Sequence, residues 1–179
     1  IRPVSSSENT ILYQGFVSGP GVDGTNFFGL YADDGAGQPD RLVVRQGDHA
    51  PGLSPNTQFD GVASTLVNRQ GQIALSTELR GSDVALTNNT AIYVYEPDGS
   101  ARLVVREGDL APGTPGQTFD SLTFGELGFN SQSQVAFYTG LVNPGDDFAS
   151  NAGLFLADPL LGIIPIVVGG QLFEVAPGD

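Results

Sequence analysis

The sequence repeats itself with a period of about 62 residues, and this feature constrains the fold more than any other. The segment Arg-Leu-Val-Val-Arg-Gln-Gly-Asp at 41–48 returns 61 residues later as Arg-Leu-Val-Val-Arg-Glu-Gly-Asp. A second segment, Asn-Arg-Gln-Gly-Gln-Ile-Ala-Leu at 68–75, returns 62 residues later as Asn-Ser-Gln-Ser-Gln-Val-Ala-Phe. Tandem units of this kind fold into similar small substructures that pack in series.

Each unit predicts short strands separated by turns. In the second copy, apolar alternation predicts strands over 72–79, 90–95, 101–106 and 119–124. The link Glu-Pro-Asp-Gly-Ser at 96–100 has the composition of a tight turn, because Pro sets a negative φ and Gly accepts a positive one. Nothing long has the spacing of an amphipathic helix, so the sequence predicts an all-β protein with four antiparallel strands per unit.

Four short antiparallel strands in a tandem unit are typical of β-propeller blades, and a sandwich or another β-repeat is the alternative. We divide the chain into an N-terminal strand segment, 1–9, two full repeats, 10–71 and 72–133, and a third repeat, 134–179. The third repeat has candidate strands over 134–141, 152–157 and 163–168 and then ends at Ala-Pro-Gly-Asp. We therefore expect the last blade to lack its fourth strand, leaving an edge that could pair with another chain.

The N-terminal residues are the candidate to fill that edge, because a shift of one period places them in the register of a fourth strand. Donation to a neighbouring copy would use ladder hydrogen bonds for strength and side-chain pockets for register. A closed ring, a mutually exchanged dimer and an open fibre all remain possible products. The expected self-assembly residues are Ile1, Arg2, Pro3, Val4 and Ser5 on the donor and Ile163, Ile164, Ile166, Val167 and Val168 on the acceptor.

Several polar residues recur at the same place in two repeats. Arg45 and Arg106 each stand three residues before an aspartate, Asp48 and Asp109. An arginine fork could clamp a carboxylate ligand, but a structural role in holding the turn or joining units is the favoured interpretation. Asn68 and Asn130 open the second recurring segment and are assigned to the same structural class.

Acidic loops offer oxygen ligands of the kind that Ca²⁺ prefers. No known calcium-binding spacing is present, so solvated acidic loops are the alternative, and no other cofactor is expected. The candidate ligands are Asp23, Asn26, Asp33, Asp34, Asp146 and Asp147.

Composition excludes several classes of function. Seven Lys+Arg against 20 Asp+Glu give a formal charge of −13, which opposes binding to nucleic acid phosphates. The chain has no Cys and one histidine, His49, whose equivalent in the second copy is Leu110, so we predict no catalytic residues. No apolar run is long enough for a membrane span. The absence of Met and the abundance of acidic residues and Gly suggest an extracellular or cell-surface protein after signal-peptide removal.

The two motifs together resemble those of the bacterial tandem-repeat proteins named for their NxxGxxAF motif, which include anchored and PEP-CTERM-associated extracellular proteins. The resemblance extends over essentially the whole chain. It implies a secreted or surface-attached protein without an established catalytic role. The first copy departs from the motif, with Ser6 and Asn9 in place of Asn and Gly, and the third lacks the Arg and Asp of the first motif.

The leading hypothesis is a non-catalytic extracellular structural protein that self-associates by N-terminal strand donation, into a fibre or surface assembly. The alternative is a secreted propeller-type module that binds a glycan or a protein, with or without Ca²⁺. A hydrolase is disfavoured by the residue inventory.

Overall fold

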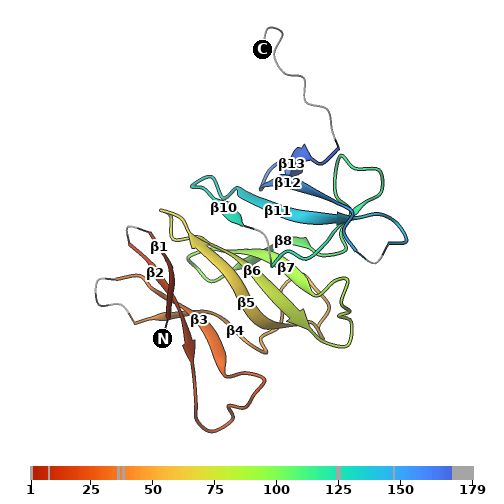
Figure 1. Ribbon diagram of the computed structural model, residues 1–179. Coiled ribbons are helices and arrows are strands. Elements are labelled where there is room, and N and C mark those ends of the chain that lie inside the picture. Colours follow the sequence, from red (N-terminus) through yellow and green to blue (C-terminus); the bar gives the residue numbers. More distant parts are fainter. Residues whose placement is uncertain are drawn as a thin grey trace.

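The computed structural model describes residues 2–7, 9–35, 37, 39–123, 126–146 and 148–170, with Arg2 described for its backbone alone. These residues form three antiparallel sheets and no helix (Figure 1). A search of the same residues for a helix able to cross a membrane finds none. The all-β prediction is confirmed.

The three sheets follow one another along the chain and share one strand order. The first contains β1 (Arg2–Ser6), β2 (Ile11–Phe16), β3 (Phe28–Asp33) and β4 (Arg41–Arg45). The second contains β5 (Gln58–Val67), β6 (Ile73–Arg80), β7 (Thr90–Tyr95) and β8 (Ala101–Arg106). The third contains β9 (Thr118–Phe119), β10 (Leu127–Phe129), β11 (Val135–Val142), β12 (Asn151–Asp158) and β13 (Gly162–Val168), with β9 and β10 both paired to β11.

Three of the four strands predicted for the second copy form, as β6, β7 and β8, and the hairpins follow the turn chemistry. The strand predicted over 119–124 is wrong, because β9 ends at Phe119 and residues 120–123 lie outside any strand. Between β7 and β8, Glu96 N–H donates to the Ser100 carbonyl and Gly99 adopts a φ of 87°. Each sheet also carries a β-bulge at the same place, where its third and fourth strands pair: Tyr31 opposes Leu42, Tyr93 opposes Leu103 and Phe155 opposes Pro165. The recurrence of the sequence is thus matched by a recurrence of backbone register.

The prediction that the last blade lacks its fourth strand is wrong. Segments expected to end a unit instead hydrogen-bond to the first strand of the next unit: β5 pairs with β6, and β9 and β10 pair with β11. Likewise β1 pairs with β2 in its own chain, with a bulge between Pro3 and Ser5. Side-chain alternation is the same for either partner, so it could not reveal which neighbour receives the strand. All three sheets are therefore complete within one chain.

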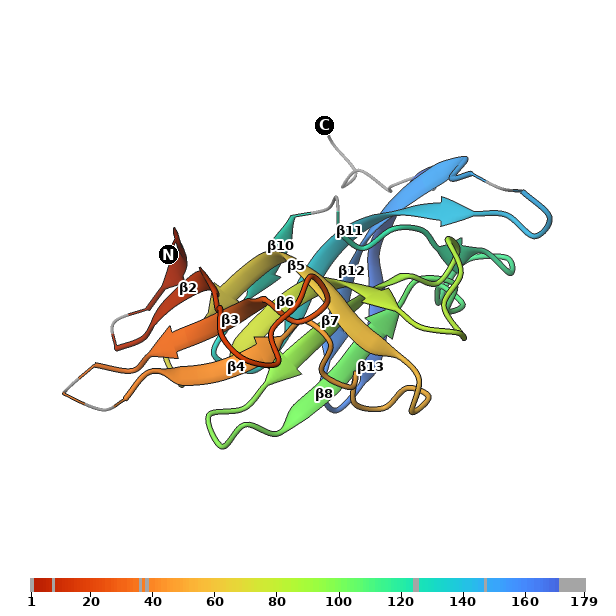
Figure 2. The same cartoon turned by 90° about the horizontal axis from the view of Figure 1, so that it is seen from below.

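Two hydrophobic cores lie between the sheets, and the second sheet contributes to both. One core joins the first and second sheets around Leu12, Leu30, Phe59 and Tyr93. The other joins the second and third sheets around Ile92, Phe119, Phe137 and Phe155. Figure 2 shows the second sheet, in yellow and green, between the other two.

The links between sheets help to seal these cores. Ala50 and Ala111, from the two recurring Ala-Pro-Gly turns, are buried in the first and second core respectively. Each turn rests on the next sheet: a Cβ added at Gly52 would lie 3.6 Å from Leu103 Cβ, and one at Gly113 would lie 2.8 Å from Pro165 Cγ. Tyr93 Oη donates to the Pro51 carbonyl at 3.0 Å. The motif is thus a structural link between consecutive sheets.

The recurring asparagines close tight turns at the ends of β5 and β10. The Asn68 side-chain oxygen accepts from the N–H groups of Gln70 and Gln72, both at 3.0 Å, and its amide donates to Gln72 Oε1. Asn130 makes the matching bonds with Gln132 and Gln134. Asn68 also donates to the Asn130 carbonyl at 3.0 Å, which joins the second sheet to the third.

We expect Asn68→Ala to lower the free energy of unfolding by about 1–2 kcal/mol, the usual cost of losing a side-chain cap. Asn130→Ala is the matched control and should cost less, because Asn130 is exposed and its side chain makes no counterpart of the bond between the two turns. Urea denaturation measures both. Equal losses would contradict the role assigned to the inter-sheet bond.

Candidate functional site: the outward faces of the end sheets

Because successive side chains point to opposite sides of a strand, each sheet has two faces. We define the names of the two faces on the second sheet and apply them to the other sheets. Its leading face packs on the first sheet and includes Ile73, Leu75 and Tyr93. Its trailing face packs on the third sheet and includes Ala74, Ile92 and Val94. Both faces are apolar and both are covered.

The leading face of the first sheet is uncovered in the described structure. Ile11, Tyr13 and Tyr31 stand 62 residues before Ile73, Leu75 and Tyr93, the core residues of the second sheet's leading face. Ile73 and Tyr93 are fully buried, whereas Ile11 is 48 % exposed and Tyr31 is half-buried. Leu42, whose counterpart Leu103 packs against the first core, is also 48 % exposed. Residues whose counterparts in the second sheet form a core are thus partly exposed to solvent in the first sheet.

Tyr31 forms a flat platform on this face. Its ring lies over two glycines, since a Cβ at Gly29 would come within 3.0 Å and one at Gly15 within 3.3 Å of the ring. Tyr13 stacks on Tyr31 with ring centroids 5.4 Å apart. The Tyr13 hydroxyl donates to the Asp40 carboxylate, and this bond, with burial second, raises the pKa of Tyr13 to about 12. Tyr13 therefore stays neutral at physiological pH, and the two stacked rings present aromatic surface on this face.

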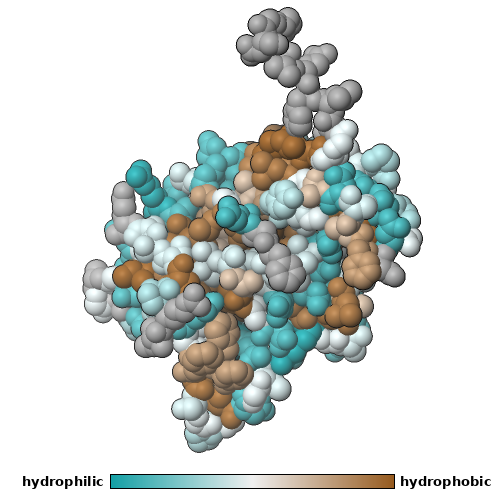
Figure 3. Space-filling model, viewed as in Figure 1, coloured by the Kyte–Doolittle hydropathy of each residue, from teal (hydrophilic) through white to brown (hydrophobic). Residues whose placement is uncertain are grey.

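Within the part of the chain that the structure describes, the trailing face of the third sheet is uncovered as well. Tyr138 is 53 % and Ile166 48 % exposed. Leu154 and Leu156 are half-buried, although their counterparts 62 residues earlier, Ile92 and Val94, are fully buried in the core between the second and third sheets. Figure 3 shows apolar surface over β13, which borders this face.

These two faces were not singled out by the sequence reasoning, although a signal was present. A strand with one covered face alternates apolar and polar residues, whereas a strand covered on both faces is apolar throughout. Strands β3, β12 and β13 have near-continuous apolar sequences, Phe-Gly-Leu-Tyr-Ala, Ala-Gly-Leu-Phe-Leu-Ala and Gly-Ile-Ile-Pro-Ile-Val-Val. The sequences of these strands therefore indicate sheets that are buried on both faces, whereas in the described structure each of these sheets is covered on one face.

The predicted self-assembly residues lie in two separate places. Arg2, Pro3, Val4 and Ser5 belong to β1, and Val4 packs against the first core. The predicted acceptor residues all belong to β13, where Ile163 packs against the second core and Val168 is buried within it. Ile1 lies outside the described residues. In the described structure β1 already pairs with β2 of its own chain, and β13 is the outer strand of the third sheet, so the pairing of β1 beside β13 of a neighbour stays a prediction.

Arg45 and Arg106 each contact the following turn and a neighbouring loop in the described structure. Asp48 Oδ2 accepts from Arg45 N–H at 2.9 Å, and Asp109 Oδ2 accepts from Arg106 N–H at 2.8 Å. The guanidinium Nε of Arg45 donates to the Asn26 carbonyl at 2.6 Å, and that of Arg106 donates to the Asn88 carbonyl at 2.8 Å. At the equivalent position, Val168 is buried in the second core. The arrangement matches the structural interpretation of these residues.

The candidate calcium ligands do not converge. The Asp23 carboxylate accepts from Thr25 N–H and Oγ1, and these bonds lower its pKa. Asn26 donates to the Gly21 carbonyl, and Asp33 accepts from Gly35 N–H. Asp34 faces Arg41 at 3.3 Å, and Asp146 accepts from Asn143. Asp147 lies outside the described residues. Among those described, no group of three or more His, Cys, Asp or Glu side chains is placed to hold a metal.

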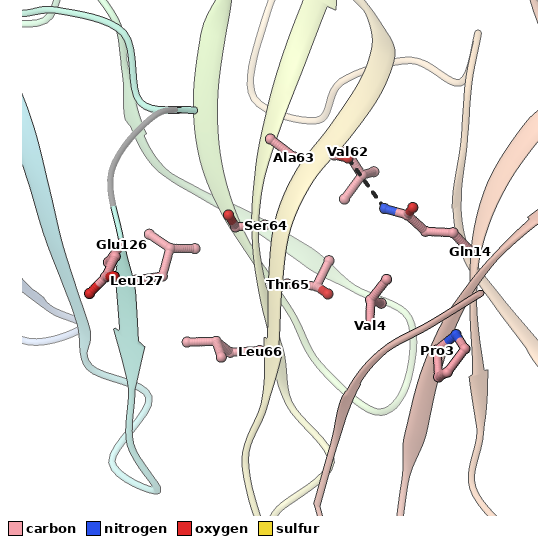
Figure 4. Close-up of a pocket in the computed structure, with 10 residues that line it drawn as sticks. All are labelled: Pro3, Val4, Gln14, Val62, Ala63, Ser64, Thr65, Leu66, Glu126 and Leu127. Carbon is pink, nitrogen blue, oxygen red and sulfur yellow. Dashed lines mark hydrogen bonds between the residues drawn. The ribbon is translucent and has the colours of Figure 1, made fainter.

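A cleft of about 520 Å³ opens where the first strands of the three sheets meet. It is lined by Val4 of β1, by β5 and by Leu127 of β10, with Gln14 of β2 crossing to donate to the Val62 carbonyl at 3.3 Å (Figure 4). Its walls are backbone, hydroxyl and aliphatic groups with one carboxylate, Glu126. The cleft runs along β5, which contributes five of its lining residues.

A buried carboxylate marks the contact between the second sheet and the segment that leads into the third. Glu107 is 5 % exposed, and its Oε2 accepts from Thr90 N–H and Oγ1 at 3.0 and 2.9 Å. The Leu122 N–H donates to the same Thr90 hydroxyl at 2.9 Å. Burial raises the pKa of Glu107 above its usual range and outweighs the Thr90 hydrogen bonds, which lower it.

Because the pKa of Glu107 is higher in the folded than in the unfolded state, its contribution to stability falls as pH rises through the folded pKa. Glu107→Gln keeps the acceptor and removes the charge. We expect the variant to gain stability relative to the native protein on going from pH 4 to pH 8, measured by urea denaturation at each pH. A stability difference that stays constant with pH would contradict this assignment.

Comparisons with known proteins bear on the whole chain. The sequence model of a family of unknown function, DUF7453, matches residues 2–179. No protein with a curated description matches the chain. The matched family has no stated connection with NxxGxxAF proteins, so that resemblance stays a prediction.

Proposed function

The chain belongs to the DUF7453 family, whose function is unknown, and we propose that it is a non-catalytic, self-associating structural protein. The three sheets would act as propeller-like blades, and copies would associate by packing the trailing face of the third sheet on the leading face of the first. An extracellular or cell-surface location, as composition suggests, is part of the proposal. This mechanism replaces strand donation with face-to-face packing.

One observation carries the proposal: the two uncovered faces are the repeat counterparts of faces that already pack together twice within the molecule. Leu30, on the first sheet's trailing face, and Tyr93, on the second sheet's leading face, share one core. Ile92 and Phe155 occupy the same two positions one unit later and share the other core. Leu154 and Tyr31 occupy these positions once more, on the two uncovered faces. A second copy would bring them together.

Burial of apolar side chains supplies the free energy that would hold two copies together. Fully burying an exposed aliphatic or aromatic side chain contributes about 1.5–3 kcal/mol, and a side chain that is half exposed contributes about half of that. Leu42, Tyr31, Tyr138 and Ile166 are all available for this. The net charge of −13 acts against association, and salt screens it, so association should strengthen as ionic strength rises.

Two substitutions on opposite faces test the mechanism. Leu42→Arg places a charge on the leading face and Ile166→Arg places one on the trailing face. Each should weaken self-association about tenfold or more. In solutions dilute enough to hold single chains, each should leave the melting temperature unchanged, since both positions are half exposed in the single chain. Analytical ultracentrifugation and thermal scans give the two readouts. Leu86→Arg, at an 88 % exposed leucine outside both faces, is the matched control and should leave association unchanged.

Mixing the two variants makes the test specific. An intact trailing face on the Leu42→Arg protein can still pack on an intact leading face of the Ile166→Arg protein, so the mixture should associate more strongly than either variant alone. If leading faces paired with leading faces, or trailing faces with trailing faces, the mixture would show no such rescue. Absence of rescue would contradict the proposed contact.

The alternative function, a binding module for a glycan or protein, is favoured by the Tyr13–Tyr31 stack, because exposed aromatic platforms also bind ligands. Under that alternative, Tyr31→Ala removes ligand binding and leaves the mass of the protein in solution unchanged.

A further inference from the structure

We infer that the partner is one second copy of this chain and that the product is a closed, two-fold symmetric ring of six sheets. This inference rests on the proposed function and adds to it the number of copies and the symmetry. Two observations, the convergence of the sheets and the matching of their end faces, lead to it.

The sheets converge on one axis. Between sheets, the described strands approach each other most closely at β1 with β5 and at β5 with β10, the first strands of their sheets. All three of these strands border the same cleft. The last strands, β4, β8 and β13, form the opposite edges of the sheets. Between these last strands the described structure shows no contact as extensive as those between the first strands. Sheets that touch mainly along one edge act as wedges, and wedges added in one direction curve around the axis.

The number of sheets then follows from the ring sizes that wedge-shaped sheets form. Closed rings of four-stranded sheets typically contain four to eight members. The three sheets of the described residues fall below this range, two copies of them supply six and three copies supply nine. Two copies are therefore the number of this unit that fits a ring of the usual size. Closed two-fold dimers are also the commonest homo-oligomers.

Closure by two copies covers every face that a single copy leaves open. The trailing face of each copy, with Leu154 and Ile166, packs on the leading face of the other, with Tyr31 and Leu42. The two contacts are identical by symmetry, so neither end remains to recruit a third copy. The cleft lined by Val4, Gln14 and Leu127 is half of a site that the second copy completes as a central channel.

The solution mass of the native protein, measured by light scattering over a hundredfold range of concentration and at low and high salt, tests the inference. We expect the mass to rise with concentration from that of one chain to that of two chains, and to rise no further. Growth beyond two chains would overturn the closed ring while leaving face-to-face association intact. A mass of one chain under all conditions would overturn both.

Cysteine cross-linking distinguishes a ring from an open dimer. The chain has no native cysteine, so Leu42→Cys combined with Ile166→Cys introduces the two thiols on opposite faces. Their counterparts on the packed sheets, Leu103 and Val43, both pack against the first core, so we expect a bismaleimide to bridge the new thiols across the contact. A ring yields dimers carrying two links, identified by intact mass. Dimers with a single link, or a ladder of larger products, would contradict closure.

Discussion

Packing of one sheet's trailing face on the next sheet's leading face is the interaction on which the structure depends. A four-stranded sheet has two faces, and in this chain both carry Leu, Ile, Val, Phe and Tyr. The second sheet buries both, with Tyr93 on one side and Ile92 on the other. The first and third sheets bury one each. The same interaction therefore explains the stability of the chain and the two apolar surfaces that it leaves uncovered.

Polar groups set the relative positions of the sheets. Asn68 joins two turns across a sheet boundary, Tyr93 holds the Pro51 carbonyl, and Thr90 connects Glu107 to the Leu122 N–H. These hydrogen bonds connect residues that are far apart in the sequence, and each requires a defined geometry. Together they set the register at which the apolar faces of the sheets meet. A second copy would present the same apolar faces, but without the chain connection that holds consecutive sheets of one molecule together.

Much of the fold could be predicted from the sequence. The strands over 90–95 and 101–106 have the predicted bounds, and the Glu96–Ser100 turn forms the predicted hairpin. The partner of the Gln58–Val67 strand could not be predicted, because hydrogen bonding to either neighbour requires the same alternation of side chains. That ambiguity produced the expected vacant edge. The outward faces were missed for a different reason: Tyr31 and Leu154 have the composition of core residues, and exposure depends on whether another sheet follows.

Hydroxyl-radical footprinting of the tyrosines across a concentration series tests the central claim most directly. Tyr31 and Tyr138 lie on the two opposite outward faces, and Phe148, 82 % exposed in a loop, serves as the internal reference. The account predicts that Tyr31 and Tyr138 become protected together, over the concentrations at which the mass doubles, while Phe148 stays reactive. Association that leaves either tyrosine as reactive as in the dilute protein would contradict it.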